Sequence, residues 1–217
     1  MDALEAIMTT RAMRRFSDRP VADADIETCL RAAQQAPSGG NVQPQQYLVV
    51  TEPDRRAIAA EWYRTAFDRY EATLSAVAAG IADDDAREAW ERSSAASRHL
   101  ADHLADVPAI VIFLQAAFAW GASDDQGPLD IGRLDASVYP AVQNFCVAAR
   151  ALGLGTALTT VIRTYTDEVL TALGVPAGRF EIAALVPVGY PTGRFGVAPR
   201  KPSTAVTHWN TWGNKRR

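Results

Sequence analysis

Residues 109–114 form an unbroken apolar run rich in β-branched side chains, which predicts a buried strand. The same kind of pattern predicts three further strands, at 46–51, 155–160 and 181–188. Residues 135–152 form the clearest helix, because their apolar side chains recur at helical spacing until Gly153 ends the pattern. Strands and helices are mixed without a strict strand–helix–strand order, so the chain is predicted to have an α+β fold.

Helical patterns account for most of the remaining chain. The predicted helices run from about 2 to 10, from Asp23 to the break at Pro37, over 54–82 and 83–106, and near 166–173. Residues 11–20 are predicted to form a basic loop, and residues 121–130 a loop rich in Gly, Asp and Pro. Because no repeat, long linker or shift in composition interrupts the 217 residues, we expect a single domain over 1–217.

The composition, 48% hydrophobic and 22% charged, is typical of a soluble globular protein. The acidic first residues lack the basic and apolar segments of a signal peptide. The most apolar stretch, 107–120, is interrupted and too short to cross a bilayer. Cys29 and Cys146 lie far apart in helical patterns, which indicates neither a disulfide framework nor a metal site. We therefore expect a cytoplasmic protein without a membrane partner.

Positive charge gathers at the C-terminal end of the chain. Residues 190–217 contain six Lys or Arg residues and no acidic residue, although the whole chain has a net charge of −3. Such a segment can bind nucleic acid, pair with an acidic neighbour or hold a phosphate. We expect the last three residues to be a solvated tail and no nucleic-acid partner, whereas Arg200 and Lys201, flanked by prolines, are candidates for a phosphate contact.

Three short motifs are similar to known sites but lack essential parts. Residues 153–155, Gly-Leu-Gly, begin like a dinucleotide-binding fingerprint, but a helix precedes them where a strand is required. His99 and His103 have the spacing of two metal ligands without the glutamate that would follow the first, so we expect them to face solvent. Residues 83–85, three aspartates, are typical of helix-capping charge. Since no convincing Ser/His/Asp set is present, an enzyme of this sequence is expected to use a cofactor.

Three other groups of residues indicate what kind of cofactor that is. Arginines crowd residues 11–19, and their planar guanidinium groups suit a phosphate dianion. The segment Pro-Ser-Gly-Gly-Asn at 37–41 has more backbone freedom than an ordinary turn requires. It can simply end a helix, or it can let the backbone approach a ligand closely. Thr159 and Thr160 add a pair of hydroxyl groups at the predicted end of a strand.

Four stretches of the chain carry a family resemblance: TTRAMRRFSDRPV (9–21), AAQQAPSGGNVQPQQYLVV (32–50), VQNFCVAARALGLGTALTT (142–160) and LVPVGYPTGRFGVAPRKP (185–202). In this combination and order they resemble the nitroreductase family of FMN-dependent oxidoreductases. Each stretch is weakly specific by itself, but together they bracket nearly the whole chain. The double threonine and the Gly-Tyr-Pro…Arg-Lys-Pro pattern are more similar to the iodotyrosine-deiodinase-like branch than to the enteric nitroreductases.

The resemblance implies a nitroreductase-like central mixed sheet flanked by helices, in an intertwined homodimer with two FMN sites at the subunit interface. It also implies a ping-pong reaction, in which NAD(P)H reduces the flavin and a small-molecule electron acceptor then reoxidises it in the same pocket. Nitroaromatic or quinone-type acceptors are the leading expectation. Reductive dehalogenation, another specialised flavin reaction such as flavin destruction for cobalamin biosynthesis, or flavin binding without turnover are the alternatives.

The resemblance also assigns roles to individual residues. The cofactor-binding residues that it implies are Arg11, Ala12, Arg14, Arg15, Pro37, Ser38, Gly39, Asn41, Thr159, Thr160 and Arg200. Arg11, Arg14 and Arg200 would contact the phosphate, and Ala12 stands where the family commonly has a serine hydroxyl. Residues 37–39 would pass under one face of the flavin ring with Asn41 near its polar edge. Thr160 is the expected catalytic residue near flavin N5, while the flavin itself carries the hydride.

Two regions lie outside these motifs. Residues 54–106 are expected to form a helical excursion with five aromatic residues, Trp62, Tyr63, Phe67, Tyr70 and Trp90, whose default role is in the core or in dimer contacts. Residues 202–217 are expected to form a C-terminal arm. Two exposed tryptophans would be unusual in a soluble monomer, so Trp209 and Trp212 are expected to pack either against their own subunit or across a partner. The family resemblance, which implies intertwined arms, favours the partner subunit.

Overall fold

A computed structural model describes residues 1–118 and 120–216 of the chain. Its central sheet has the strand order β1-β2-β6-β5, and all three neighbouring pairs are antiparallel. The strands are β1 (Gln45–Val50), β2 (Ala109–Ala116), β6 (Phe180–Gly189) and β5 (Gly155–Thr156). One parallel bridge, between Ala12 and Thr156, extends the sheet at the β5 edge and makes it mixed. The predicted α+β class with a mixed sheet is therefore confirmed.

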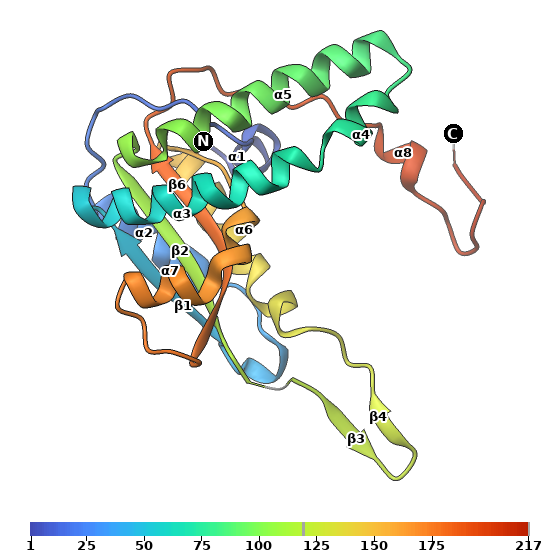
Figure 1. Ribbon diagram of the computed structural model, residues 1–217. Coiled ribbons are helices and arrows are strands. Elements are labelled where there is room, and N and C mark those ends of the chain that lie inside the picture. The colour runs from blue at the N-terminus through green and yellow to red at the C-terminus, as the bar shows by residue number, and fades with distance from the viewer. Residues whose placement is uncertain (119, 217) are drawn as a thin grey trace.

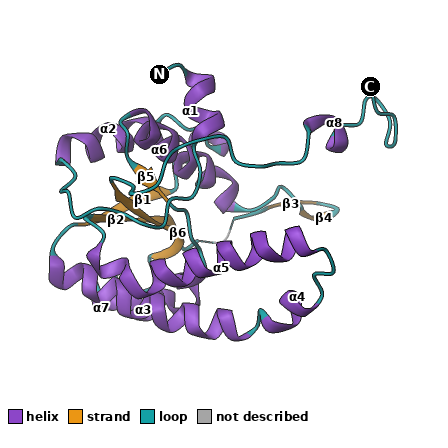
Figure 2. Ribbon diagram, turned by 90° about the horizontal axis from the view of Figure 1, so that it is seen from above, coloured by secondary structure: helices purple, strands orange, loops and turns teal. Residues whose placement is uncertain are grey.

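Helices cover both faces of this sheet, as Figures 1 and 2 show. One face is covered by α1 (Ala3–Thr9), α2 (Asp23–Gln34) and α6 (Tyr139–Ala151), and the other by α3 (Pro53–Ala72), α5 (Asp84–His103) and α7 (Thr166–Ala172). Short 3-10 turns lie at Gly39–Asn41, Leu104–Asp106, Leu134–Ser137 and Val161–Tyr165. This layering explains why residues 109–114 are almost entirely apolar, since β2 is covered on both sides.

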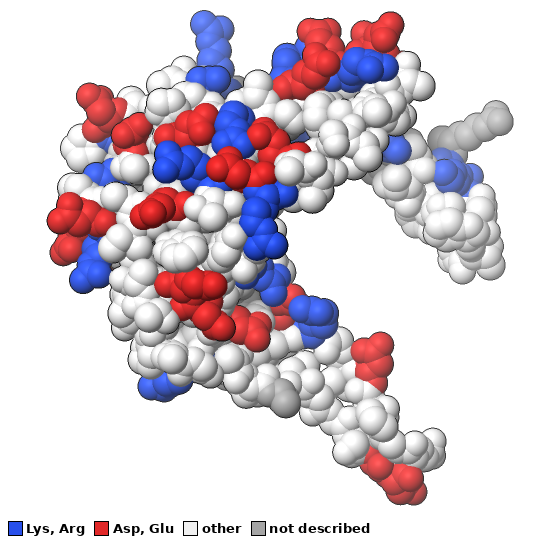
Figure 3. Space-filling view, in the orientation of Figure 1, with Lys and Arg blue, Asp and Glu red and all other residues white. Residues whose placement is uncertain are grey.

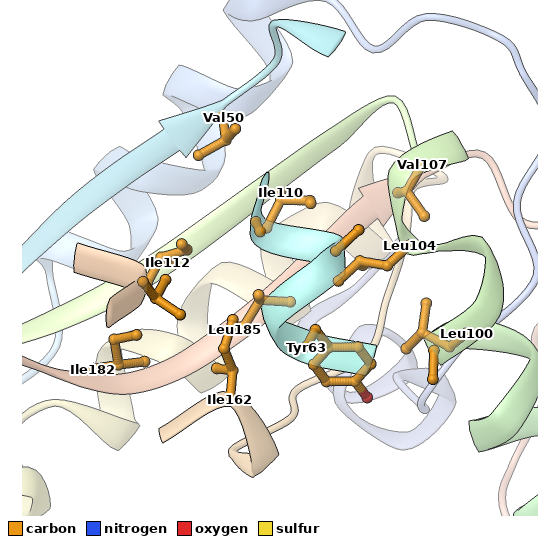
Figure 4. Close-up of a cluster of buried hydrophobic side chains, with 14 of the residues drawn as sticks. Val50, Tyr63, Leu100, Leu104, Val107, Ile110, Ile112, Ile162, Ile182 and Leu185 are labelled. Carbon is orange, nitrogen blue, oxygen red and sulfur yellow. The ribbon is translucent and has the colours of Figure 1, made fainter. Parts of the chain in front are cut away.

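Successive residues of β2 contribute to two separate cores because side chains alternate across a strand. Val111 and Phe113 pack with α2 and α6, whereas Ile110 and Ile112 pack with α3 and α5. Figure 4 shows the second of these clusters, in which Ile110 and Ile112 face the helices. Cys29 and Cys146 lie in the first cluster as buried free thiols.

Several predicted boundaries were wrong, each for a local reason. The strand predicted at 155–160 is only the two-residue β5, because Thr159 forms a single bridge with Leu185 instead of continuing the pairing. The helix predicted from 135 begins at Tyr139, since Pro140 lacks an N–H and suits the first helical turn. The long helix predicted over 54–82 is interrupted after α3, and α4 (Ser75–Ala79) follows.

Two segments extend from the body of the molecule. The predicted loop at 121–130 contains a small hairpin of β3 (Ala122–Asp124) and β4 (Gly127–Leu129), whose strands pair with each other and with no described strand of the main sheet. Beyond residue 200 the chain runs outward through α8 (Ser203–Val206), so that the arm and the hairpin stand apart from the body in Figures 1 and 3. Arg217, the last residue of the predicted arm, lies outside the described residues.

None of the described helices is long and apolar enough to cross a membrane. Gly153 has a positive φ of 78° directly after α6, which is the helix-ending role that its position predicts. Asp83 accepts a hydrogen bond from the backbone N–H of Ala86 at the start of α5, and this confirms its capping role.

Candidate functional site

A hollow of about 870 Å³ brings together the arginines from both ends of the chain. Its lining includes Arg11, Arg14, Arg15 and Arg200, which are the four arginines expected to bind cofactor, together with part of α5. We call it the arginine pocket. Residues 192–200 close one side, and residues 89–96 of α5 close another.

The loop that carries three of these arginines is fixed to the edge of the sheet. The backbone N–H of Met13 donates to the carbonyl of Thr156 over 2.8 Å, and Ala12 bridges to the same threonine. The Met13 side chain is buried, so its neighbours Ala12 and Arg14 are held at the pocket wall. Ala12 lies in the pocket but offers no hydroxyl, as the sequence already indicated.

The arginine pocket is strongly positive. Its described lining also includes Arg92 and Arg194 and contains no acidic residue. Arg11 and Arg14 form no ion pair within the described parts of the chain, and Arg14 is half-buried. Burial lowers the pKa of the Arg14 guanidinium, because its charge is partly removed from water. Unpaired guanidinium groups in a recess are suited to bind a phosphate dianion, so the donor set fits the phosphate of FMN.

A second hollow, of about 490 Å³, adjoins the arginine pocket, and Arg14 and Ser93 line both. We call it the aromatic pocket. Its walls come from α3, α4, α5 and residues 157–161. Its aromatic side chains are Tyr63, Phe67, Tyr70 and Trp90, and its aliphatic hydroxyl groups come from Ser93, Ser94, Ser97 and Thr159.

Four of the five aromatic residues of the helical excursion therefore line a pocket. Tyr63 and Phe67 also belong to the hydrophobic core, which agrees with their default prediction. Trp62 packs instead against Tyr165, with ring centroids 5.2 Å apart. The sequence identified the aromatic set but not which rings face a cavity, because helical spacing does not say what lies opposite a helix.

The two threonines occupy different environments. Thr159 is half-buried in the aromatic pocket, and its backbone exchanges two hydrogen bonds with Leu185, of 2.9 and 2.8 Å. Thr160 is exposed and lines a neighbouring, more open hollow of about 350 Å³, which Thr159 also borders. Thr159 thus borders both hollows and is the more deeply placed, whereas Thr160 lines the more open one.

Residues 37–41 do not reach either pocket in the same chain. They lie near the start of β1, at the opposite end of the sheet from the basic loop (Figure 1). The backbone N–H of Gly39 donates to Ser137 Oγ over 3.1 Å, while Pro37 and Asn41 are exposed. One chain therefore presents two separate groups of the residues predicted to bind cofactor.

The segment around Asn41 is strained and is held by side-chain amides. Gly40, Asn41 and Gln43 have φ values of 56°, 54° and 45°, a region that favours glycine. Gln43 Nε2 donates to Asn41 Oδ1 over 3.0 Å, and Gln34 Nε2 donates to Gln43 Oε1 over 3.1 Å. The Ser38 hydroxyl also accepts from the backbone N–H of Gln43. These bonds fix the side chain of Asn41 on an exposed loop, where strain of this kind commonly marks a binding site.

His99 is less exposed than the sequence predicted. His99 is half-buried, and its Nδ1 accepts a hydrogen bond of 2.9 Å from Arg15. His103 is exposed and pairs with Asp106, and no metal-binding cluster occurs among the described residues. No sequence signal links Arg15 to His99, because the two residues are separated by 84 positions and meet only when α5 covers the basic loop.

Solved structures of other proteins share this fold over nearly the whole length of both chains. The chain superposes on a BluB-like flavoprotein from Clostridium difficile with a TM-score of 0.72 at 19% identity, covering 97% of this chain and 100% of the other. It superposes on an iodotyrosine deiodinase bound to FMN and 3-iodo-L-tyrosine with a TM-score of 0.71, also at 19% identity and over 97% and 100% of the two chains. At this level of identity the similarity establishes the fold.

The curated relatives match a smaller part of the chain than these structures do. A 5,6-dimethylbenzimidazole synthase of Rhodospirillum rubrum is 29% identical over 178 residues, which is 81% of this chain and 76% of the relative. An Archaeoglobus fulgidus protein, to which an NADH dehydrogenase/NAD(P)H nitroreductase activity is provisionally assigned, is 47% identical over 51 residues. That second match covers 24% of this chain and only 29% of the archaeal protein.

The family model described as "Nitroreductase family" matches residues 7–190, which include the basic loop, the 37–41 segment and both threonines. The structural neighbours include members of the branch that the sequence resembles. Together with the two adjoining pockets, these matches support a flavin-dependent oxidoreductase. The chain belongs to the nitroreductase family.

Proposed function

We propose that this protein is an FMN-dependent oxidoreductase that uses NAD(P)H to reduce nitroaromatic or quinone-type acceptors in a ping-pong cycle. The observation that carries the proposal is the continuity of the arginine and aromatic pockets through Arg14. A ligand with a phosphate at one end and a flat ring system at the other has the chemistry of both pockets. Relatives of the same fold bind FMN, which supports this choice of ligand.

In this proposal the chain binds and orients, and FMN when bound supplies the capacity to accept and release a hydride. Arg11, Arg14 and Arg200 hold the phosphate, with Arg15 beside them. Thr159 and Thr160 offer hydroxyl donors near the reactive edge of the flavin, and Thr160 is the residue that the family resemblance indicates for this role. The aromatic pocket excludes water and admits a planar acceptor.

The active unit in this proposal is a homodimer. Pro37 and Asn41 are exposed, and residues 37–41 are remote from the arginine pocket of their own chain, so a second copy is needed to bring them to a cofactor. The partner's loop would then supply the backbone at 37–39 and the amide of Asn41. The C-terminal arm, which extends away from its own body, is a second element that a partner subunit can accept.

The relatives favour one alternative within the same cofactor chemistry. Similarity to a 5,6-dimethylbenzimidazole synthase and to an iodotyrosine deiodinase is compatible with a specialised flavin reaction, such as flavin destruction or reductive dehalogenation. A flavin-binding protein without turnover is the third candidate. All three functions use the bound flavin. They differ in whether the reduced flavin passes on its electrons and in which molecule receives them.

The decisive experiment is to purify the full-length protein, release its pigment by heat and identify it by chromatography. We expect FMN at about one per chain and no FAD, because the pockets contain no glycine-rich pyrophosphate loop. Rapid bleaching by NADPH or NADH would then distinguish a reductase from a flavin-binding protein. Anaerobic stopped-flow mixing of the reduced protein with quinones, nitroarenes and halotyrosines would identify the acceptor. Recovery of FAD or of no flavin would contradict the proposal.

A further inference from the structure

Tyr63 is a buried residue whose hydroxyl group reaches the candidate site. It lies on α3 with only 2% of its surface exposed, and in Figure 4 it lies among Leu100, Ile162 and Leu185. Its hydroxyl oxygen is 3.3 Å from Thr159 Oγ1. Tyr63 also lines the aromatic pocket together with Thr159.

Either oxygen of this pair can donate, and the surroundings favour one direction. A buried phenol that keeps its hydrogen needs an acceptor, because leaving it unpaired costs free energy. Thr159 Oγ1 is the only partner of the Tyr63 hydroxyl within the described residues. Burial raises the pKa of Tyr63 above its ordinary value, although the bond to Thr159 and the charge of Arg14 oppose this, so the phenol stays protonated at neutral pH. In the arrangement that satisfies the protonated phenol, Tyr63 donates and Thr159 Oγ1 accepts.

This direction leaves the hydrogen of the Thr159 hydroxyl free to bind something else. The backbone N–H and carbonyl of Thr159 are both bonded to Leu185, so the main chain at this position is fixed against β6. When Oγ1 accepts from Tyr63, its own hydrogen is available to another partner, and the cavity that Thr159 lines is the aromatic pocket. No side-chain hydrogen bond orients Thr160 in a comparable way within the described chain.

We propose that Tyr63 is a positioning residue, which orients the Thr159 hydroxyl so that it donates a hydrogen bond to the flavin bound in the two pockets. The inference rests on the proposed function and extends it, since it assigns a role to a core residue of α3 that lies outside all four family motifs. It also makes Thr159 a flavin donor in its own right, next to Thr160. Through Tyr63, the helical excursion would affect the electronic environment of the cofactor.

The test uses the full-length protein and three variants that remove or keep the hydrogen bond. Tyr63→Phe keeps the buried ring, Thr159→Val removes the acceptor, and Thr159→Ser keeps a hydroxyl group. Each protein is stripped of flavin and titrated with FMN, and the visible spectrum of the bound flavin and the ¹⁵N chemical shift of its N5 are recorded. A merely structural tyrosine would affect melting temperature without changing these two signatures of hydrogen bonding.

We expect Tyr63→Phe and Thr159→Val to weaken FMN binding by about two- to tenfold, the effect of one lost hydrogen bond. Both should shift the N5 signal in the same direction, whereas Thr159→Ser should resemble the wild type. The double variant should be no weaker than the poorer single variant, because both substitutions remove the same interaction. Tyr165→Phe is the matched control: its hydroxyl accepts a 3.0 Å bond from Arg69 outside both pockets, so its loss should leave FMN binding and spectrum unchanged.

The possible failures are distinguishable. If the wild type does not bind FMN, the proposed function and this inference are both overturned. If the wild type binds FMN but Tyr63→Phe matches it in affinity, spectrum and N5 shift, only the inference is overturned. Additive effects in the double variant would also contradict it. Should Tyr63→Phe fail to fold, the comparison of Thr159→Val with Thr159→Ser decides, and identical behaviour of those two proteins would overturn the inference.

Discussion

The guanidinium group of Arg15 donates a hydrogen bond to Nδ1 of His99 over 2.9 Å and thereby joins the basic loop to α5. The bond requires that His99 be neutral with its hydrogen on Nε2. Burial, followed by the nearby charges of Arg15 and His103, lowers the pKa of His99 below its ordinary value of 6.5. Asp102 and Asp106 act in the opposite direction without cancelling this shift.

Stability should therefore decrease on acidification through this histidine. Because the pKa of His99 is lower in the folded than in the unfolded chain, the unfolded chain binds more protons just below about pH 6.5. The contribution of His99 is fully present above that pH and is lost as the pH falls toward the folded-state pKa. Melting temperatures measured from about pH 7.5 to 5 should drop more steeply for the wild type than for His99→Gln, which keeps an acceptor but does not titrate. Parallel curves would show that the bond is not linked to protonation.

Gly155→Ala should displace the basic loop from the side on which the loop contacts β5. A Cβ at Gly155 would lie 2.9 Å from Met13 Cβ and 3.1 Å from Pro191 Cβ, and neither atom is the mobile end of a side chain. Relief of this overlap requires the loop to move, at a typical cost of about 1–3 kcal/mol in the free energy of unfolding. We expect a lower melting temperature and weaker FMN binding. Gly196→Ala, where the added atom meets nothing within 4 Å, is the matched control and should melt like the wild type.

Arg14→Ala should weaken FMN binding without unfolding the protein. Arg14 is the arginine shared by both pockets, and a hydrogen bond between charged groups contributes ~1.5–3 kcal/mol, or about ten- to a hundredfold in affinity. Titration of the flavin-free variant with FMN measures the loss. Arg31→Ala removes an exposed arginine of α2 that bonds only to Thr28 within the described structure, and it should bind FMN normally. Unchanged affinity in Arg14→Ala would place the phosphate elsewhere.

Deletion of residues 203–217 should lower both the dimer fraction and flavin retention. Trp212 is 90% exposed, and within the described chain its ring stacks on His208 of the same arm, while Arg216 lies over the ring of Trp209. The arm thus does not bury its tryptophans against its own body, and soluble proteins rarely leave such apolar surface in water. Sedimentation of the truncated protein, with FMN measured by absorbance, checks the expectation. An undiminished dimer with its full complement of FMN would show that the arm is dispensable for assembly.

The double variant Trp209→Ser/Trp212→Ser separates the apolar rings from the rest of the arm. If the rings provide the contact, this protein should lose dimer nearly as much as the truncation does, because burial of two indole groups is the main favourable term. If the double variant still forms the dimer but the truncated protein does not, the contact is made by the backbone or by the basic residues of the arm.

Elements with a local signal could be predicted from the amino-acid sequence. Residues 109–114 were predicted as a covered strand, because an unbroken apolar run rich in β-branched side chains leaves no polar face for water. The end of α6 at Gly153 was also predictable, since a helix often ends at a residue with a left-handed backbone conformation, and glycine adopts that conformation readily. The basic loop, the 37–41 segment and the threonine pair were also recognisable, because each is a short contiguous motif.

Relationships between residues far apart in the chain required the tertiary structure. It showed that Arg11 and Arg14 share a pocket with Arg200, and that residues 37–41 are turned away from that pocket. It also selected Tyr63 rather than Trp62 as the ring that meets Thr159, although the two are neighbours on one helix. Periodicity gives the side of a helix on which a residue lies, but the groups that pack against that side depend on how β6 and the 157–161 segment are placed. That placement results from the packing of the whole sheet, which no local pattern encodes.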